Sequence, residues 1–77
     1  MNDVDKFIKE FNRERKANKG KWITFVGSVN GHDCWIKSFD TWIQRAEYRG
    51  MVDSPPVDCK VRAMNEWLAN FLEYGEV

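Results

Sequence analysis

The dipeptide Asn30-Gly31 lies between two short segments that are rich in β-branched and aromatic residues. Asparagine and glycine both tolerate the positive φ angles that a two-residue type I′ turn requires. Residues 21–29 and 32–38 are therefore predicted to be the two strands of a β-hairpin. Because a two-residue loop fixes the pairing of its strands, the turn also predicts which side chains share a face.

The predicted register gives the hairpin two chemically different faces. The first face is mainly apolar, includes Ile23, Phe25 and Ile36, and is expected to pack against helices. The second face carries large rings among polar side chains, namely Trp22, Thr24, Val26, Trp35, Lys37 and Phe39. If both helices cover the first face, the second face is open to water and unusually apolar for a monomer. One helix on each face, or two open faces meeting in a homodimer, would bury it instead.

Residues 3–18 have the periodicity of an amphipathic helix. Val4, Phe7, Ile8 and Phe11 fall on one side of a 3.6-residue period, and the apolar stripe stops after Phe11. The last turn is expected to be solvated because it is rich in basic side chains, which are Arg13, Arg15, Lys16 and Lys19.

A second helix is expected toward the C-terminus. Ser54 can cap it, and the Pro55-Pro56 pair that follows suits a first helical turn. Apolar residues then recur at helical spacing from Val57, and the pattern ends near Tyr74.

Residues 39–52 are compatible with two structures. Their apolar residues could form a helical stripe, whereas the β-branched and aromatic residues of segment 41–49 favour a third strand. A strand would place on the second face either Ile43, Arg45 and Glu47 or Trp42, Gln44 and Tyr48. We favour the strand. The sequence then predicts a single α+β domain over residues 1–77, with a three-stranded antiparallel meander between two helices (α-β-β-β-α).

No arrangement of residues typical of a catalytic or cofactor site is present in the sequence. The single histidine, His32, shares a face with Cys34, but neither belongs to a Cys-x-x-Cys or paired-histidine spacing. The glycines are accounted for by turns or close packing and form no phosphate-binding loop. We therefore expect no catalytic residues, no cofactor and no metal, and a protein that is not an enzyme.

The cysteines and the N-terminus indicate the compartment. Cys34 and Cys59 could form at most one disulfide, which is fewer than a small secreted fold usually has. The N-terminus is charged and lacks the apolar run of a signal peptide, and no segment approaches the length of a membrane span. A cytoplasmic protein with reduced thiols and no membrane partner is expected.

Two binding functions are compatible with the second face. In a protein-binding module, aromatic and cationic side chains would supply most of the interface energy, and the expected contact residues are Trp22, Trp35, Lys37 and Arg45. In a single-stranded nucleic-acid-binding module, the rings would stack bases while phosphates would meet Lys37, Arg45 and the basic run Arg13, Arg15, Lys16, Lys19 and Lys21. The net charge is zero, and residues 22–77 carry five basic against eight acidic side chains, which favours a protein partner.

The segment Trp42-Ile43-Gln44-Arg45-Ala46-Glu47-Tyr48, followed by a glycine and a proline-started C-terminal helix, resembles the small accessory proteins that phages and prophages encode. The resemblance is one of overall style and contains no motif with a known role, so it assigns no functional residue. It implies a protein that binds and blocks a host protein, with inhibitors of bacterial defence, including anti-CRISPR proteins, as one such class.

Overall fold

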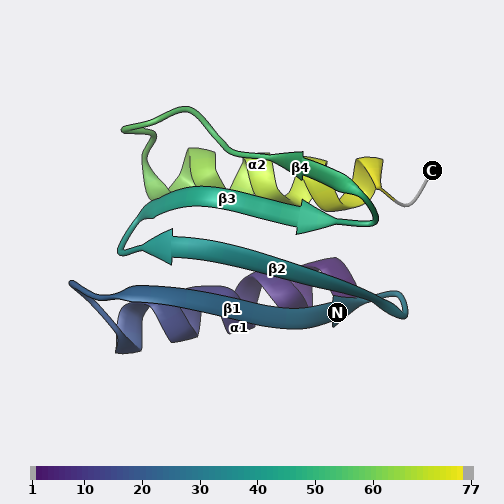
Figure 1. The fold of residues 1–77 in the computed structure, drawn as a ribbon, viewed down its shortest axis with the longest axis horizontal. Helices are drawn as coiled ribbons and strands as arrows, with labels where there is room; N and C mark the ends of the chain where they lie inside the picture. The colour runs from purple at the N-terminus through teal and green to yellow at the C-terminus, as the bar shows by residue number, and fades with distance from the viewer. Residues whose placement is uncertain (1, 76–77) are drawn as a thin grey trace.

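The computed structural model describes residues 2–75 and confirms an α+β fold (Figure 1). The elements follow the chain as α1 (Asp3–Ala17), β1 (Trp22–Val29), β2 (His32–Phe39), β3 (Trp42–Tyr48), β4 (Met51–Asp53) and α2 (Val61–Tyr74). The four strands form one antiparallel sheet in the order β1-β2-β3-β4. The predicted meander is therefore present, and the short β4 extends it at one edge.

The hairpin of β1 and β2 has the register that its turn predicts. Asn30 and Gly31 have φ angles of 50° and 84°, as a type I′ turn requires. The strands pair from Val29 with His32 to Trp22 with Phe39, without interruption. The Asn30 N–H donates to a carboxylate oxygen of Asp3 at 2.9 Å, which ties the turn to the start of α1.

The ambiguous segment is a strand, but neither predicted alternation describes its faces. A β-bulge between β2 and β3 changes the register, so that Lys37 pairs with Arg45 while the next residue, Ser38, pairs with Ile43. Gln44 is thereby left as an extra residue. The bulge reverses the inside–outside alternation within β3. As a result, Ile43 before the bulge and Ala46 and Tyr48 after it are all buried. Trp42, Gln44 and Arg45 are all exposed.

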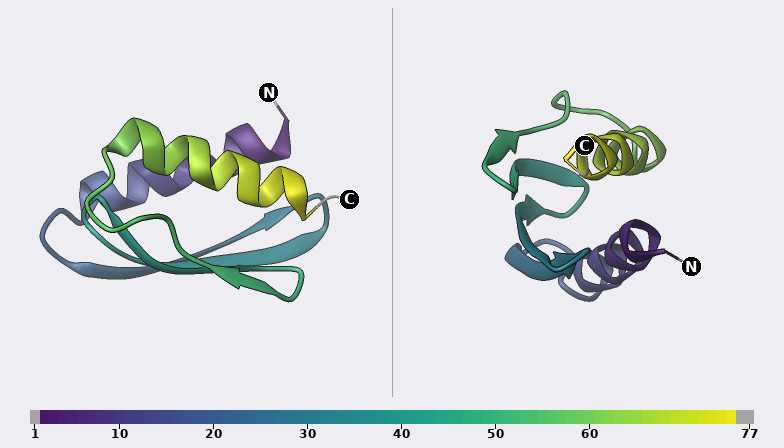
Figure 2. Two further views of the ribbon diagram at one scale, coloured as in Figure 1. Left: turned by 90° about the horizontal axis from the view of Figure 1, so that it is seen from above. Right: turned by 90° about the vertical axis from the view of Figure 1, so that its right-hand side faces the viewer.

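Both helices pack against the same face of the sheet, as the end-on view in Figure 2 shows. A helix on each face, one of the two alternatives for burying the second face, is therefore wrong. α1 begins at an Asn2 cap, whose side chain accepts from the Asp5 N–H at 2.8 Å. Its buried face contains Val4, Phe7 and Phe11, in agreement with the predicted stripe.

One basic residue of α1 is not solvated as predicted. Arg15 is only 5% exposed, and its Nε donates to the Asn12 side-chain oxygen at 2.7 Å. Asn12 in turn donates to the Asn65 side chain of α2 at 2.9 Å. The two helices are thus joined by a partly buried polar network, which the helical periodicity of α1 alone does not reveal.

The predicted start of the second helix is wrong by several residues. α2 begins at Val61, and its N-cap position is Lys60, which makes no side-chain capping bond. The stretch from Ser54 to Lys60 is a loop in which Pro55 is buried and Val57 is exposed. The Ser-Pro-Pro signal therefore marks the end of β4 and the start of a loop, while the helix begins nearly two turns later, at Val61.

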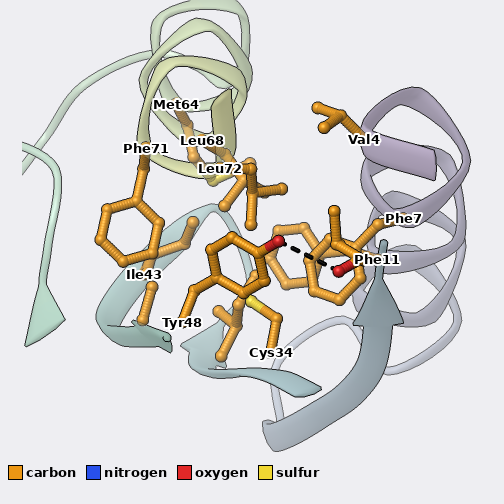
Figure 3. Packing of buried hydrophobic residues seen from close by; sticks show 13 residues of the cluster. Val4, Phe7, Phe11, Cys34, Ile43, Tyr48, Met64, Leu68, Phe71 and Leu72 are labelled. Atoms are coloured by element: carbon orange, nitrogen blue, oxygen red, sulfur yellow. Dashed lines mark hydrogen bonds between the residues drawn. The ribbon is translucent and has the colours of Figure 1, made fainter. Parts of the chain in front are cut away.

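The core lies between the helices and the sheet (Figure 3). Phe7 and Phe11 of α1 face Met64, Leu68 and Leu72 of α2 across it. The sheet contributes Val29, Cys34, Ile36, Ile43, Ala46 and Tyr48, all fully buried. The Tyr48 hydroxyl crosses the core to donate to the Val29 carbonyl at 3.0 Å, shown as the dashed line in Figure 3. The predicted core residue Ile36 is fully buried, whereas Ile23 and Phe25 of β1 are partly buried.

Candidate binding surface on the open sheet face

The face of the sheet that is turned away from the helices is uncovered, and we call it the open face (Figure 2). Its residues come from all four strands: Trp22, Thr24, Val26, Ser28, Asp33, Trp35, Lys37, Phe39, Trp42, Arg45, Glu47 and Val52, with Gln44 at the bulge. Val26 is 64% exposed and Trp22 is 49% exposed. This is more ring and aliphatic surface than the single exposed apolar residues usual for a monomer, so the open face is the candidate binding surface.

Three rings cluster at one end of the open face. The Trp22 ring centroid lies 5.4 Å from that of Phe39 and 5.5 Å from that of Trp42, and both pairs are tilted. Tilted contacts at these distances are the favoured geometry for aromatic pairs. The three rings therefore pack against one another and form a partly exposed apolar patch across β1, β2 and β3.

Both cations predicted for the site lie over tryptophan rings. The Lys37 ammonium is 5.5 Å from the centroid of Trp22, and the Arg45 guanidinium is 5.6 Å from that of Trp35. Contacts at this distance are cation–π interactions that fix long, flexible side chains in place. The four predicted contact residues are thus brought together as two ring–cation pairs on one surface.

The two cations differ in their charge partners. Arg45 also faces Glu47, with an N–O distance of 3.6 Å between partly exposed groups, so its charge is partly balanced. Within residues 2–75, Lys37 has no carboxylate at ion-pair distance. The Lys37 charge is therefore available to a binding partner that carries an acidic group.

A shallow hollow lies beside the second ring–cation pair. It is lined by Trp35, Lys37 and Arg45, together with Gln44, Val52, Asp53 and Ser54. Three of the four predicted contact residues therefore surround one depression, which has an aromatic wall, two cations and one acidic residue, Asp53. Such a depression can accept a single protruding side chain of a partner.

The basic run predicted for nucleic-acid binding lies elsewhere. Because α1 is on the helix side of the sheet, its basic residues do not belong to the open face. Arg13, Lys16, Lys19 and Lys21 are exposed, but Arg15 is buried and bonded to Asn12. Lys16 and Lys19 lie around a hollow at the end of the sheet that Asp40 also lines. The run is therefore shorter than predicted and faces a carboxylate.

The thiols and the histidine do not form a chemical site. Burial raises the pKa of the Cys34 thiol from 9.0 to about 12, which keeps it protonated and unreactive at neutral pH. Cys59 is a second free cysteine and is partly buried, while His32 is exposed at the hairpin end. Within the part of the chain that the structure describes, no three His, Cys, Asp or Glu side chains are grouped to hold a metal ion. Neither described helix is long and apolar enough to cross a membrane.

Trp42 is the main residue of the open face that the sequence pattern does not identify. It was placed on this face only in the alternative that also exposed Tyr48, which is in fact buried. The bulge places Trp42 and Arg45 on the same face although they are three residues apart. No signal within β3 itself indicates the bulge, because it depends on how β3 pairs with β2.

No protein family model, no curated protein and no solved structure matches the chain. The function is therefore inferred from the open face itself.

Proposed function

We propose that this domain binds another protein through the open face and acts without catalysis. The observation that carries the proposal is the pairing of Lys37 with Trp22 and of Arg45 with Trp35 on a surface that no helix covers. Tryptophan and arginine supply a large share of the binding energy at protein interfaces. Because each cation already contacts a ring of the same domain, these side chains would lose little further entropy when a partner binds.

The chemistry of the open face favours a partner segment with an apolar side chain next to a carboxylate. The apolar side chain would enter the hollow against Trp35, and the carboxylate would meet Lys37, whose charge is unbalanced. The ring cluster around Trp22 would then cover the adjoining apolar surface of the partner. In the terms of the phage-protein resemblance, binding of this kind would block a surface of a host protein.

A protein partner fits the open face better than a single nucleic-acid strand. Two of its charged residues, Asp33 and Glu47, are acidic, and Glu47 already faces Arg45. The basic end of α1 lies on the other side of the sheet, so one strand cannot reach its cations and the open-face rings without passing around the sheet end. Phosphate contacts normally dominate nucleic-acid affinity, and the open face offers few.

The test compares Trp35→Ala with Tyr74→Ala. Each variant removes one aromatic side chain, but Tyr74 lies on α2, outside the open face, and is 74% exposed. A protein captured by the wild-type domain from nuclease-treated host extract is identified, purified and titrated against all three forms. We expect Trp35→Ala to weaken binding at least 30-fold, about 2 kcal/mol, and Tyr74→Ala to leave it unchanged.

Two outcomes would contradict the proposal. Equal affinity of both variants for the purified partner would show that the open face is not the contact surface. Tight, salt-sensitive binding of a single-stranded oligonucleotide, lost in Trp35→Ala, would show that the face binds nucleic acid instead. Circular dichroism of both variants confirms that the fold is retained.

A further inference from the structure

The strand β1 is the outer strand of the sheet on one side, and its outer edge carries unpaired backbone groups. In the two-residue turn, Val29 and His32 form a hydrogen-bonded pair, and such pairs alternate along an antiparallel ladder. The odd-numbered residues of β1 therefore bond to β2. The N–H and C=O groups of Trp22, Thr24, Val26 and Ser28 point away from the sheet.

This edge lacks the features that usually prevent strand addition. Native edge strands are commonly short or interrupted by proline, lysine or a bulge. β1 is eight residues long, contains no charged residue and no proline, and pairs with β2 without a bulge. It therefore offers a regular row of donors and acceptors to another strand.

The opposite edge of the sheet, formed by β4, is protected against strand addition, so of the two edges only β1 is open to it. β4 contains only three residues, and of these only Val52 directs its backbone groups outward by the same alternation. Pro55 and Pro56 follow within three residues and have no N–H to donate.

The side chains of β1 also remain accessible on both faces. None of residues 22–28 is fully buried, whereas Cys34, Ile36 and Ser38 on the same core-facing side of β2 are all 0% exposed. Apolar surface of Ile23 and Phe25 is thus left beside the free edge on the helix side. A strand added to β1 would cover it.

The charges of α1 favour one particular strand. The first turn of α1 carries the exposed Asp3 and Asp5, and its last turn carries the exposed Lys16, followed by the exposed Lys19 and Lys21. α1 runs in the opposite direction to β1, since Asp3 bonds to Asn30 beyond the far end of the strand. The flank of β1 is therefore acidic at one end and basic at the other, which is complementary to its own copy turned around.

We propose that β1 pairs with β1 of a second copy of the chain, antiparallel and about a two-fold axis near Phe25. In this register the outward-facing groups of Thr24 meet those of Val26 of the second copy, and Trp22 meets Ser28. No two charged residues of β1 are opposed, because it has none. Lys21 of one copy comes to the Asn30 end of the other, where the Asp3 carboxylate lies.

The dimer joins two four-stranded sheets into one sheet of eight strands. The open faces of both copies then lie on the same side of this sheet, so each dimer presents two sets of ring–cation pairs. The Trp35–Arg45 pair of the proposed function lies on β2 and β3, away from the new contact, whereas Trp22 lies on β1 beside it. Dimer formation and partner binding are tested separately, because the dimer is measured without any partner.

The test places proline at an outward-facing N–H on each edge. Thr24→Pro removes a donor that the dimer needs but that the β1–β2 ladder does not use, and Val52→Pro makes the matched change in β4. Sedimentation equilibrium is measured from low micromolar to near-millimolar concentration. We expect the wild type and Val52→Pro to be dimers with the same dissociation constant, and Thr24→Pro to be a monomer that still unfolds cooperatively.

Hydrogen exchange gives an independent measurement on the wild-type chain. The amides of Thr24 and Val26 should become protected as the concentration rises, while the Val52 amide should not change. A wild-type chain that is monomeric throughout the concentration range would overturn the proposal. So would a Thr24→Pro dimer as tight as the wild type, because the contact would then lie elsewhere.

Discussion

Gly27 lies where the sheet and Phe7 of α1 are close together, so its replacement by alanine tests the packing of the core. A Cβ atom at this position would lie 2.8 Å and 2.9 Å from two ring carbons of Phe7. Carbon atoms in contact prefer about 3.5–4.0 Å, so the ring would need to move by roughly 0.7 Å. Phe7 is 2% exposed and packs edge-on against Phe25 at 5.1 Å, which leaves it little room to move.

Two opposing effects determine the size of the change. Overpacking of a core typically costs about 1–3 kcal/mol. Replacing glycine within a strand recovers about 0.5–1 kcal/mol through the reduced freedom of the unfolded chain. We therefore expect Gly27→Ala to lower the free energy of unfolding by about 1–2 kcal/mol, and the urea midpoint by about 1–2 M for a small domain.

Urea unfolding followed by tryptophan fluorescence measures this change, with Ser28→Ala as the control on the exposed side of the same strand. Phe7→Leu removes the ring that the new methyl group meets. The loss of unfolding free energy caused by Phe7→Leu should therefore be smaller in the Gly27→Ala background than in the wild type, by about 0.5–1 kcal/mol in a double-mutant cycle. A Gly27→Ala variant as stable as the wild type would refute the close approach of Phe7.

Two further predictions concern buried groups of the core. Tyr48→Phe removes the hydroxyl that donates to the Val29 carbonyl and should lower the free energy of unfolding by about 1 kcal/mol in the same urea assay, whereas an unchanged midpoint would contradict the bond. At pH 8 a thiol reagent should label Cys59 first and Cys34 only on unfolding, because burial raises the Cys34 pKa to about 12. The unfolded chain loses the Cys34 proton at a lower pH than the folded chain, so the free energy of unfolding should also fall as pH rises from about 9 toward 12. Rapid labelling of both thiols in the folded protein would contradict the burial of Cys34.

The sequence was sufficient to predict structure that is set locally. The Asn30-Gly31 turn determines the register of β1 and β2, and this register correctly assigned Trp22 and Trp35 to the face opposite Ile36. Residue periodicity likewise identified the buried side of α1. In both cases the signal, a turn or a residue periodicity, lies within a short segment of the chain.

The features that were missed depend on contacts between distant segments. Arg15 is buried and bonds to Asn12, which in turn bonds to Asn65, more than fifty residues further along the chain. The start of α2 was placed too early because Ser54-Pro55-Pro56 has the composition of a helix start, although Pro55 is instead buried within a loop. The faces of β3 depend on its pairing with β2, which no pattern within β3 indicates.

The bulge at Gln44 also determines which side chains of β3 lie on the open face and which lie in the core. Side chains along a strand alternate between its two faces, and the extra residue of a bulge shifts this alternation by one between Trp42 and Arg45. Removing Gln44 would restore regular pairing, with Ile43 opposite Ser38 and Arg45 opposite Lys37, so every other side chain of β3 would keep its face. If Gln44 stayed and the bulge were lost, strict alternation would put Trp42 in the core in place of Ile43, or Arg45 in place of Ala46. The four-residue stretch from Trp42 to Arg45 therefore presents both of these side chains on the open face only as long as the bulge absorbs Gln44.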